Sequence, residues 1–110
     1  MGKKCGKQTI CFDDSVYIRS YFSSVGKLEG EGPLGNSFDV VYKDAYIEAK
    51  SWEQAENNIL KNTVTGAFAK AGLTWDDMDY VFSGDLLNQC TASSFALKDM
   101  CIPYYGLYGA

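Results

Sequence analysis

The stretch Y-V-F-S-G-D-L-L-N-Q, residues 80–89, joins a short apolar run to a polar turn. A segment with helical spacing follows over Thr91–Met100, and a second apolar run covers Tyr104–Tyr108. Strand, turn, helix and strand in this order are typical of a parallel α/β sheet, because parallel strands need a crossover connection. Ligands of open parallel sheets gather at the carboxyl ends of the strands. We therefore expect any ligand site of this chain at the turn Gly84–Gln89.

The clearest helix precedes this strand and covers Ser51–Ala71. Ser51 and Gln54 form an S-x-x-Q capping box at its start, and Gly72 is suited to a left-handed cap at its end. Apolar and small side chains recur every three or four positions along it. They are Trp52, Ala55, Ile59, Thr63, Val64, Ala67, Phe68 and Ala71. This spacing predicts a helix that packs its Ile59, Val64 and Phe68 side on a sheet.

The segments before this helix are less regular. Lys7–Phe12 predicts a short strand, and Val16–Val25 predicts the first strand of the main sheet. Gly26–Gly35 is rich in glycine and contains a proline, which predicts a loop, and Ser37–Ile47 is ambiguous and includes a possible short helix. We treat residues 26–50 as a loop or insertion. The expected fold class is α/β, a single domain over residues 1–110 with β-α-β-α-β order and parallel strands in a layered sheet.

Composition excludes several functions. The chain has 110 residues with 10 basic and 14 acidic side chains, and its basic residues form no patch beyond Lys3, Lys4 and Lys7, so we expect no nucleic-acid partner. No apolar run approaches the roughly 20 residues of a membrane span. The sequence has no histidine and no C-x-x-C pair among its four cysteines, so we predict no metal site and no cofactor. A Ser-His or Cys-His catalytic unit cannot be built from these residues alone.

The candidate ligand-binding residues are Asp85, Asn88 and Gln89. An alternative role for Asp85 and Asn88 is structural, as Asx-type caps that accept hydrogen bonds from the free N–H groups of the next helix. The two roles are compatible. Cys90 and Cys101 are expected to be small buried apolar residues rather than nucleophiles, because neither has a cationic neighbour in the sequence. We therefore assign no catalytic residue.

The ending I-P-Y-x-x-L-x-G-A at Ile102–Ala110 looks like the N-terminal half of thiolase-fold proteins. Three motifs resemble one family within that superfamily. They are E-G-P-L-G-x-x-F-D at Glu31–Asp39, W-E-x-A-E at Trp52–Glu56 and G-D-L-L-N-Q at Gly84–Gln89. This combination resembles the stage V sporulation protein AD family, whose members are thiolase-fold proteins related to ketoacyl synthase III. The resemblance runs from about Lys7 to Ala110 and implies the N-terminal half of a thiolase-like fold. We expect the chain to be the N-terminal part of something longer, because an apolar strand leads directly into its last residues.

The resemblance implies a non-catalytic protein that binds dipicolinic acid and helps to bring it into the developing spore. It also implies partners in the same spore transport complex, a homodimer at full length, and a location in the cytoplasm or at the periphery of the forespore or spore inner membrane. The alternative is an acyl-thioester condensing enzyme of the ketoacyl synthase III type, whose catalytic cysteine would follow Ala110. Whether the protein is an enzyme stays open, with the binding function favoured.

Overall fold

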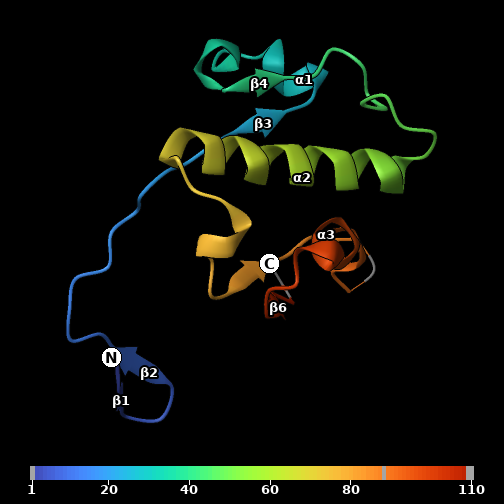
Figure 1. Cartoon of the computed structure of the whole chain (residues 1–110). Coiled ribbons are helices and arrows are strands. Elements are labelled where there is room, and N and C mark those ends of the chain that lie inside the picture. Colours follow the sequence, from blue (N-terminus) through green and yellow to red (C-terminus); the bar gives the residue numbers. More distant parts are fainter. Residues whose placement is uncertain (1, 88, 109–110) are drawn as a thin grey trace.

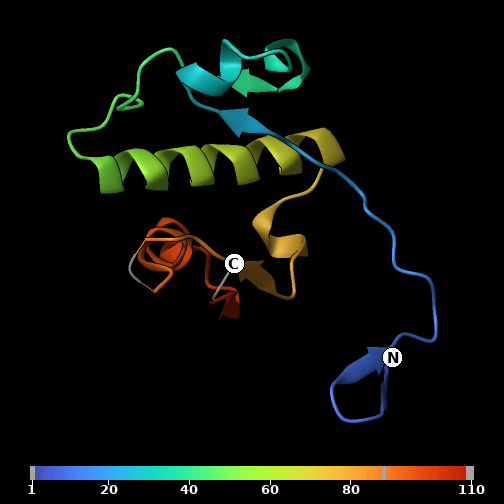
Figure 2. The same cartoon turned by 180° about the vertical axis from the view of Figure 1, so that it is seen from behind.

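A long helix, α2 (Trp52–Ala71), runs through the middle of the molecule and has strands on two sides. The computed structural model describes residues 2–87 and 89–108. Figure 1 shows β3 (Ser24–Val25), α1 (Lys27–Gly30) and β4 (Val40–Val41) on one side of this helix. On the other side lie β5 (Val81–Ser83), α3 (Thr91–Leu97) and β6 (Tyr104–Gly106), as the reverse view in Figure 2 also shows. The helix is thus shared by two small α/β layers.

Both ends of α2 are fixed by the capping residues expected from the sequence. The Ser51 hydroxyl accepts a hydrogen bond from the Gln54 N–H at 3.3 Å. The Gln54 side chain accepts from the N–H of Lys50 at 3.1 Å, one residue earlier than in a standard capping box. At the other end Gly72 has φ +66°, a left-handed conformation that glycine adopts without a Cβ penalty.

The parallel sheets are short. β3 pairs with β4, and β5 pairs with β6 in a register that sets Val81 opposite Tyr104 and Ser83 opposite Gly106. α3 and the 3₁₀ turn Lys98–Met100 connect β5 to β6. The parallel strand–helix–strand unit predicted from residues 80–108 is confirmed. The mixed α/β class is confirmed as well, and the arrangement is consistent with part of a thiolase-like fold.

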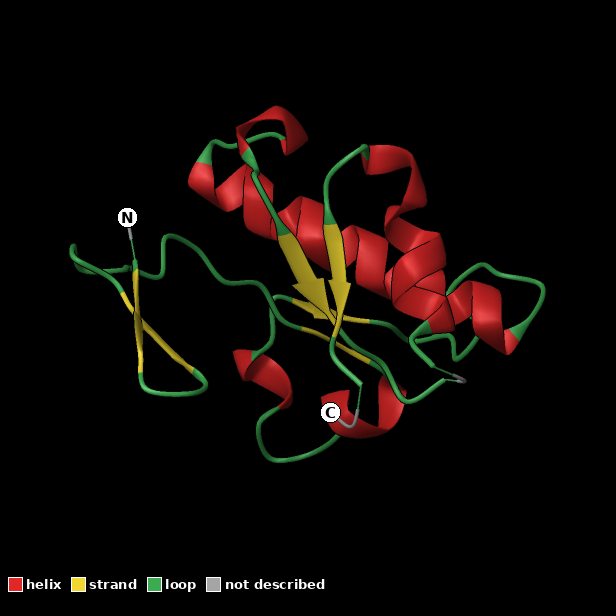
Figure 3. Cartoon of the chain, turned by 90° about the horizontal axis from the view of Figure 1, so that it is seen from below, coloured by secondary structure: helices red, strands yellow, loops and turns green. Residues whose placement is uncertain are grey.

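An antiparallel hairpin precedes these layers. β1 (Lys3–Cys5) pairs with β2 (Thr9–Cys11), and Gly6 in the connection has φ +72°. The strand predicted within Lys7–Phe12 is confirmed, whereas its partner β1 was not foreseen from the sequence. Figure 3 shows the hairpin standing apart from the helices and parallel strands.

Two segments differ from the sequence-based expectation. Within Val16–Val25 only Ser24 and Val25 form a strand, and β3 pairs with β4 rather than with β5. Residues 16–23 lack regular structure because the polar groups at 20 and 23 are held by side-chain contacts to α2 and Asp39. Residues 26–50 include α1, a 3₁₀ turn at Gly35–Ser37 and strand β4, so Ser37–Ile47 contains a strand and not the helix considered above.

The face of α2 is also used differently from the prediction. Ala55 is buried, whereas Trp52 is 60% exposed and stacks on Tyr46 with ring centroids 4.4 Å apart. Phe68 is half-buried and meets Trp75 edge-to-face at 4.5 Å. The side chains on the two flanks of α2 contact different layers, so the helix has no single buried stripe.

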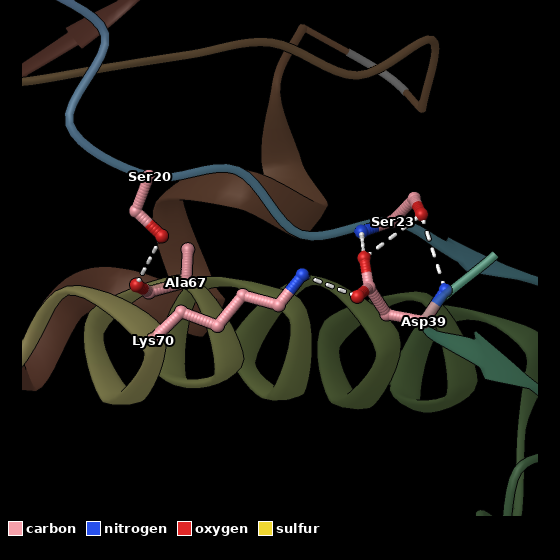
Figure 4. Close-up of polar contacts among 5 residues, drawn as sticks. All are labelled: Ser20, Ser23, Asp39, Ala67 and Lys70. Atoms are coloured by element: carbon pink, nitrogen blue, oxygen red, sulfur yellow. Dashed lines mark hydrogen bonds and ion pairs between the residues drawn. The ribbon is translucent and has the colours of Figure 1, made fainter.

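Figure 4 shows how the segment before β3 is attached to α2. The Ser20 hydroxyl donates to the Ala67 carbonyl at 2.8 Å, and the Asp39 carboxylate pairs with Lys70 while accepting from Ser23. The Phe22 ring lies so close to Gly66 that a Cβ there would be 2.6 Å from it, which only glycine permits. Three polar links and one close contact therefore replace a strand ladder in this region.

Replacement of Phe68 tests the packing of α2. Phe68→Asp should lower the free energy of unfolding by about 2 kcal/mol or more, because it removes a half-buried ring and adds a charge. Lys61 is exposed on the same helix, so Lys61→Ala should leave the chemical-denaturation midpoint nearly unchanged. Equal midpoints for the two variants would contradict this assignment.

From the contacts of Asp39 we predict that the folded protein loses stability in acid. The hydrogen bond with Lys70, followed by the Ser23 N–H, holds the Asp39 pKa below its ordinary value of 3.8. The folded state therefore favours the charged carboxylate. Its contribution to the free energy of unfolding is complete at pH values above the ordinary pKa, and this contribution is lost as pH falls through the lower pKa of the folded state. Asp39→Asn should remove this part of the pH dependence. Acid-unfolding curves with matching slopes for the wild type and this variant would show that Asp39 contributes nothing.

Candidate functional site

The candidate site is a hollow of about 340 Å³ between α2, the start of β3 and the carboxyl end of β5. Ser24 comes from β3, and Gly84 and Asp85 follow β5. The remaining lining residues come from α2 and are Glu56, Ile59, Leu60, Thr63 and Val64. The hollow thus includes Gly84 and Asp85 of the predicted turn, and α2 brings that turn close to β3 of the other sheet.

Asp85 is the organising residue of the turn. One carboxylate oxygen accepts from the Leu87 N–H at 2.9 Å, which forms an Asx turn. The other accepts from the N–H and the hydroxyl of Ser93, at 2.8 and 2.6 Å. Ser93 is in the first turn of α3, so Asp85 caps that helix from eight residues earlier. The capping role proposed for Asp85 is confirmed.

A chain of hydroxyl groups extends from Asp85 to β6. Ser93 is fully buried, and its hydroxyl lies 2.6 Å from the Tyr104 hydroxyl and 3.3 Å from the Cys90 carbonyl. Since the Ser93 hydroxyl donates to Asp85, the Tyr104 hydroxyl is the donor to Ser93, with the Ser83 carbonyl as a further acceptor at 3.3 Å. The carboxylate thus fixes β5, α3 and β6 relative to one another.

The two carboxyl groups at the hollow have opposite pKa shifts. Burial is the largest influence on Asp85 and opposes its charge, but hydrogen bonds from Ser93, Leu87 and Ala92 together outweigh burial and lower its pKa. For Glu56, burial and then the charge of Asp85 raise the pKa. Glu56 is therefore the group of this pair that holds a proton more readily, and Asp85 stays ionised.

The other residues singled out in the sequence have different outcomes in the structure. Gln89 is exposed with φ +62° and does not line the hollow, and Asn88 lies outside the described residues. Cys90 is buried as expected, and its thiol points to the Leu107 carbonyl at 3.7 Å. Cys101 is exposed with φ +55°, so its predicted burial is wrong: the chain reverses there between α3 and β6.

A larger hollow of about 490 Å³ lies between β4, the following loop and α2. Its polar groups are used to hold that loop. Asp44 accepts from the N–H of Tyr46 and Glu48, and the Asn58 amide donates to the Ile47 carbonyl. We therefore regard this hollow as a structural feature of the loop and the Asp85 hollow as the candidate site.

Sequence reasoning missed Glu56, Ser93 and Tyr104. The signal for Glu56 was available, because Glu56, Leu60 and Thr63 have helical spacing and share one face of α2 with the hollow. The Ser93–Tyr104 contact joins a helix to a strand eleven residues later, and spacing alone does not indicate it.

Two further properties concern the described residues, 2–87 and 89–108. They contain no cluster of three or more acidic, cysteine or histidine side chains arranged to hold a metal ion. None of their helices has the length and apolar character required to cross a bilayer.

The fold and the site define a layered α/β protein with a polar turn and a small hollow at the end of a parallel strand. The family model of stage V sporulation protein AD matches residues 6–110. The chain is also 37% identical over 108 residues to stage V sporulation protein AD of Bacillus subtilis (strain 168). The chain belongs to the stage V sporulation protein AD family. The alignment covers 98% of this chain and 32% of that relative, so the chain spans about a third of the relative's length.

Asp85 should be the most sensitive polar residue of the site. Asp85→Ala leaves the buried Ser93 hydroxyl and N–H without their acceptor, which should lower the free energy of unfolding by about 2–3 kcal/mol. The matched control is Asp79→Ala, because Asp79 is exposed two residues before β5. Thermal or chemical unfolding of both variants measures the difference, and an Asp85 variant as stable as the control would show that the network is dispensable.

Proposed function

We propose that this chain forms the N-terminal part of a sporulation protein that binds dipicolinic acid and assists its uptake into the developing spore without chemically changing it. Membership of the stage V sporulation protein AD family, over residues 6–110, is the observation that carries the proposal. The family's name indicates sporulation, and the ligand follows from the resemblance of the G-D-L-L-N-Q turn. The turn lies at the carboxyl end of β5, the usual place for a ligand in an α/β protein.

The chemistry of the turn and of Glu56 suggests a separate role for each residue in ligand binding. Dipicolinic acid carries two carboxylates on an aromatic ring, so it needs hydrogen-bond donors and positive charge. The Asp85 carboxylate is already bound to Leu87 and Ser93, so we assign it the positioning of the turn. The amide groups of Asn88 and Gln89 are suitable donors to the ligand. Glu56, when protonated, can donate from its carboxylic acid.

The charge of the hollow limits what it can bind alone. Its charged lining residues are both acidic, Glu56 and Asp85, and the chain has a net charge of −4. A dicarboxylate next to an ionised Asp85 is repelled unless positive groups compensate. Our proposal therefore assigns the neutralising charge to groups outside this hollow, in the full-length protein or in its partners in the transport complex.

The condensing-enzyme alternative receives less support from this part of the protein. Cys90 is buried and its thiol points to the Leu107 carbonyl, and it does not line the hollow. The enzyme function thus depends on a cysteine after Ala110. We further propose that the full-length protein is a homodimer that works in the cytoplasm or at the periphery of the forespore or spore inner membrane.

Calorimetric titration of the full-length protein with dipicolinate and with acetyl-CoA tests the function. We expect saturable heat with dipicolinate and no turnover of acetyl-CoA. Gln89→Ala should weaken dipicolinate binding by about 3- to 10-fold, the value of one hydrogen bond. Gln8→Ala is the matched control, because Gln8 is exposed in the distant hairpin. Turnover of acetyl-CoA without dipicolinate heat would favour the condensing enzyme.

A further inference from the structure

The N-terminal hairpin carries two cysteines on one face. Cys5 lies opposite Thr9 and Cys11 lies opposite Lys3. Directly opposed residues of an antiparallel pair share a face, and so do residues two apart on one strand. Cys5 and Cys11 are therefore diagonal neighbours on the same face, whereas Lys4 and Ile10 lie on the other.

The diagonal spacing is close to what a disulfide requires. Diagonal neighbours in an antiparallel pair are about 7–8 Å apart, and bridged cysteines have Cα atoms about 4.4–6.8 Å apart. Two-stranded ribbons twist more strongly than larger sheets, so a small increase in twist covers the difference. The register places both thiols on one side of the ribbon, and the neighbouring Cys5 thiol, followed by burial, raises the pKa of Cys11.

Both thiols are open to reagents from solution. Cys5 and Cys11 are exposed, in contrast to the buried Cys90. The hairpin stands apart from α2 and the parallel sheets in all three views of the chain (Figures 1, 2 and 3). An extended segment without regular structure, residues 12–23, joins it to β3, so a change in the hairpin does not require repacking of the core.

We propose that Cys5 and Cys11 are a redox modification site that forms a reversible disulfide by exchange with a small-molecule disulfide. A thiolate of the pair attacks one sulfur of the reagent, breaks its S–S bond and releases one small thiol. The second cysteine, after losing its proton, attacks the mixed disulfide and releases the other small thiol. The protein loses two electrons and two protons, and the reagent is reduced to two thiols.

The bond would change the hairpin from a weakly held ribbon to a closed ring. The ladder has only the three residue pairs from Lys3↔Cys11 to Cys5↔Thr9. An isolated two-stranded hairpin of this size is marginally stable in water. A disulfide across it restricts the unfolded segment and so favours the paired state. The reduced and oxidised proteins should therefore differ in the order of residues 2–12.

Tryptic mapping of the full-length protein tests the proposal, because Lys7 lies between the two cysteines. The reduced protein is incubated with glutathione disulfide, free thiols are alkylated, and the protein is digested. Cleavage after Lys4, Lys7 and Arg19 puts the cysteines on separate peptides, Cys5–Lys7 and Gln8–Arg19. We expect the two peptides to elute as one linked species that separates on reduction. Alkylated or glutathione-bound peptides without a linked species would overturn the proposal.

A register variant distinguishes the hairpin geometry from simple closeness in sequence. In the double variant Ile10→Cys with Cys11→Ser, the second thiol moves to the opposite face, because a shift of one residue reverses side-chain direction. We expect its linked species to form at least about tenfold more slowly than in the wild type, since the effective concentration of the two thiols falls. Equal rates would show that the ladder does not direct the bond. Because none of these cysteines is in the Asp85 hollow, dipicolinate titration remains an independent measurement.

Discussion

The Asp85 carboxylate determines how the C-terminal half of this chain is assembled. Its hydrogen bonds to Leu87 and Ser93 end β5, begin α3 and, through the Ser93 hydroxyl, hold Tyr104 on β6. Burial alone would disfavour a charge here, and the hydrogen bonds reverse that effect on its pKa. A single side chain thus accepts a hydrogen bond from an N–H group in the first turn of α3, whose N-cap residue, Cys90, makes no side-chain capping hydrogen bond.

α2 has a comparable role between the two layers. Its Thr63 hydroxyl lies 2.7 Å from the Ser24 hydroxyl on β3, and its Glu56 and Val64 side chains line the hollow next to β5. Because α2 has neighbours on two sides, the half-burial of its residues is spread around the helix. The sheets are too short to build a core of their own, and the helix supplies the common surface.

The features predicted correctly are those encoded within a few residues. The ends of α2 follow from Ser51 and Gly72, and the β5–α3–β6 unit follows from an apolar run, a helical spacing and a second apolar run. The incorrect or missing predictions concern residues whose structure depends on contacts with residues far away in the sequence. Val16–Val25 has strand composition, yet with Ser20 and Ser23 bonded to α2 and Asp39 only Ser24 and Val25 enter a ladder. The turn at Gly84–Gln89 was located from the sequence, but Glu56, Ser93 and Tyr104 complete the site through tertiary contacts.

Two adjacent residues at the end of that turn have left-handed backbone conformations, and these conformations restrict the shape of the turn. Gln89 and Cys90 have φ +62° and +61°, a conformation that costs non-glycine residues roughly 1–2 kcal/mol each. Glycine would remove this cost but would give the free loop many more backbone states. With side chains at both positions, and with Asp85 holding the flanking segments, the turn has few alternatives to its folded shape. If the turn binds a ligand as proposed, the protein loses little conformational entropy when its backbone is fixed there.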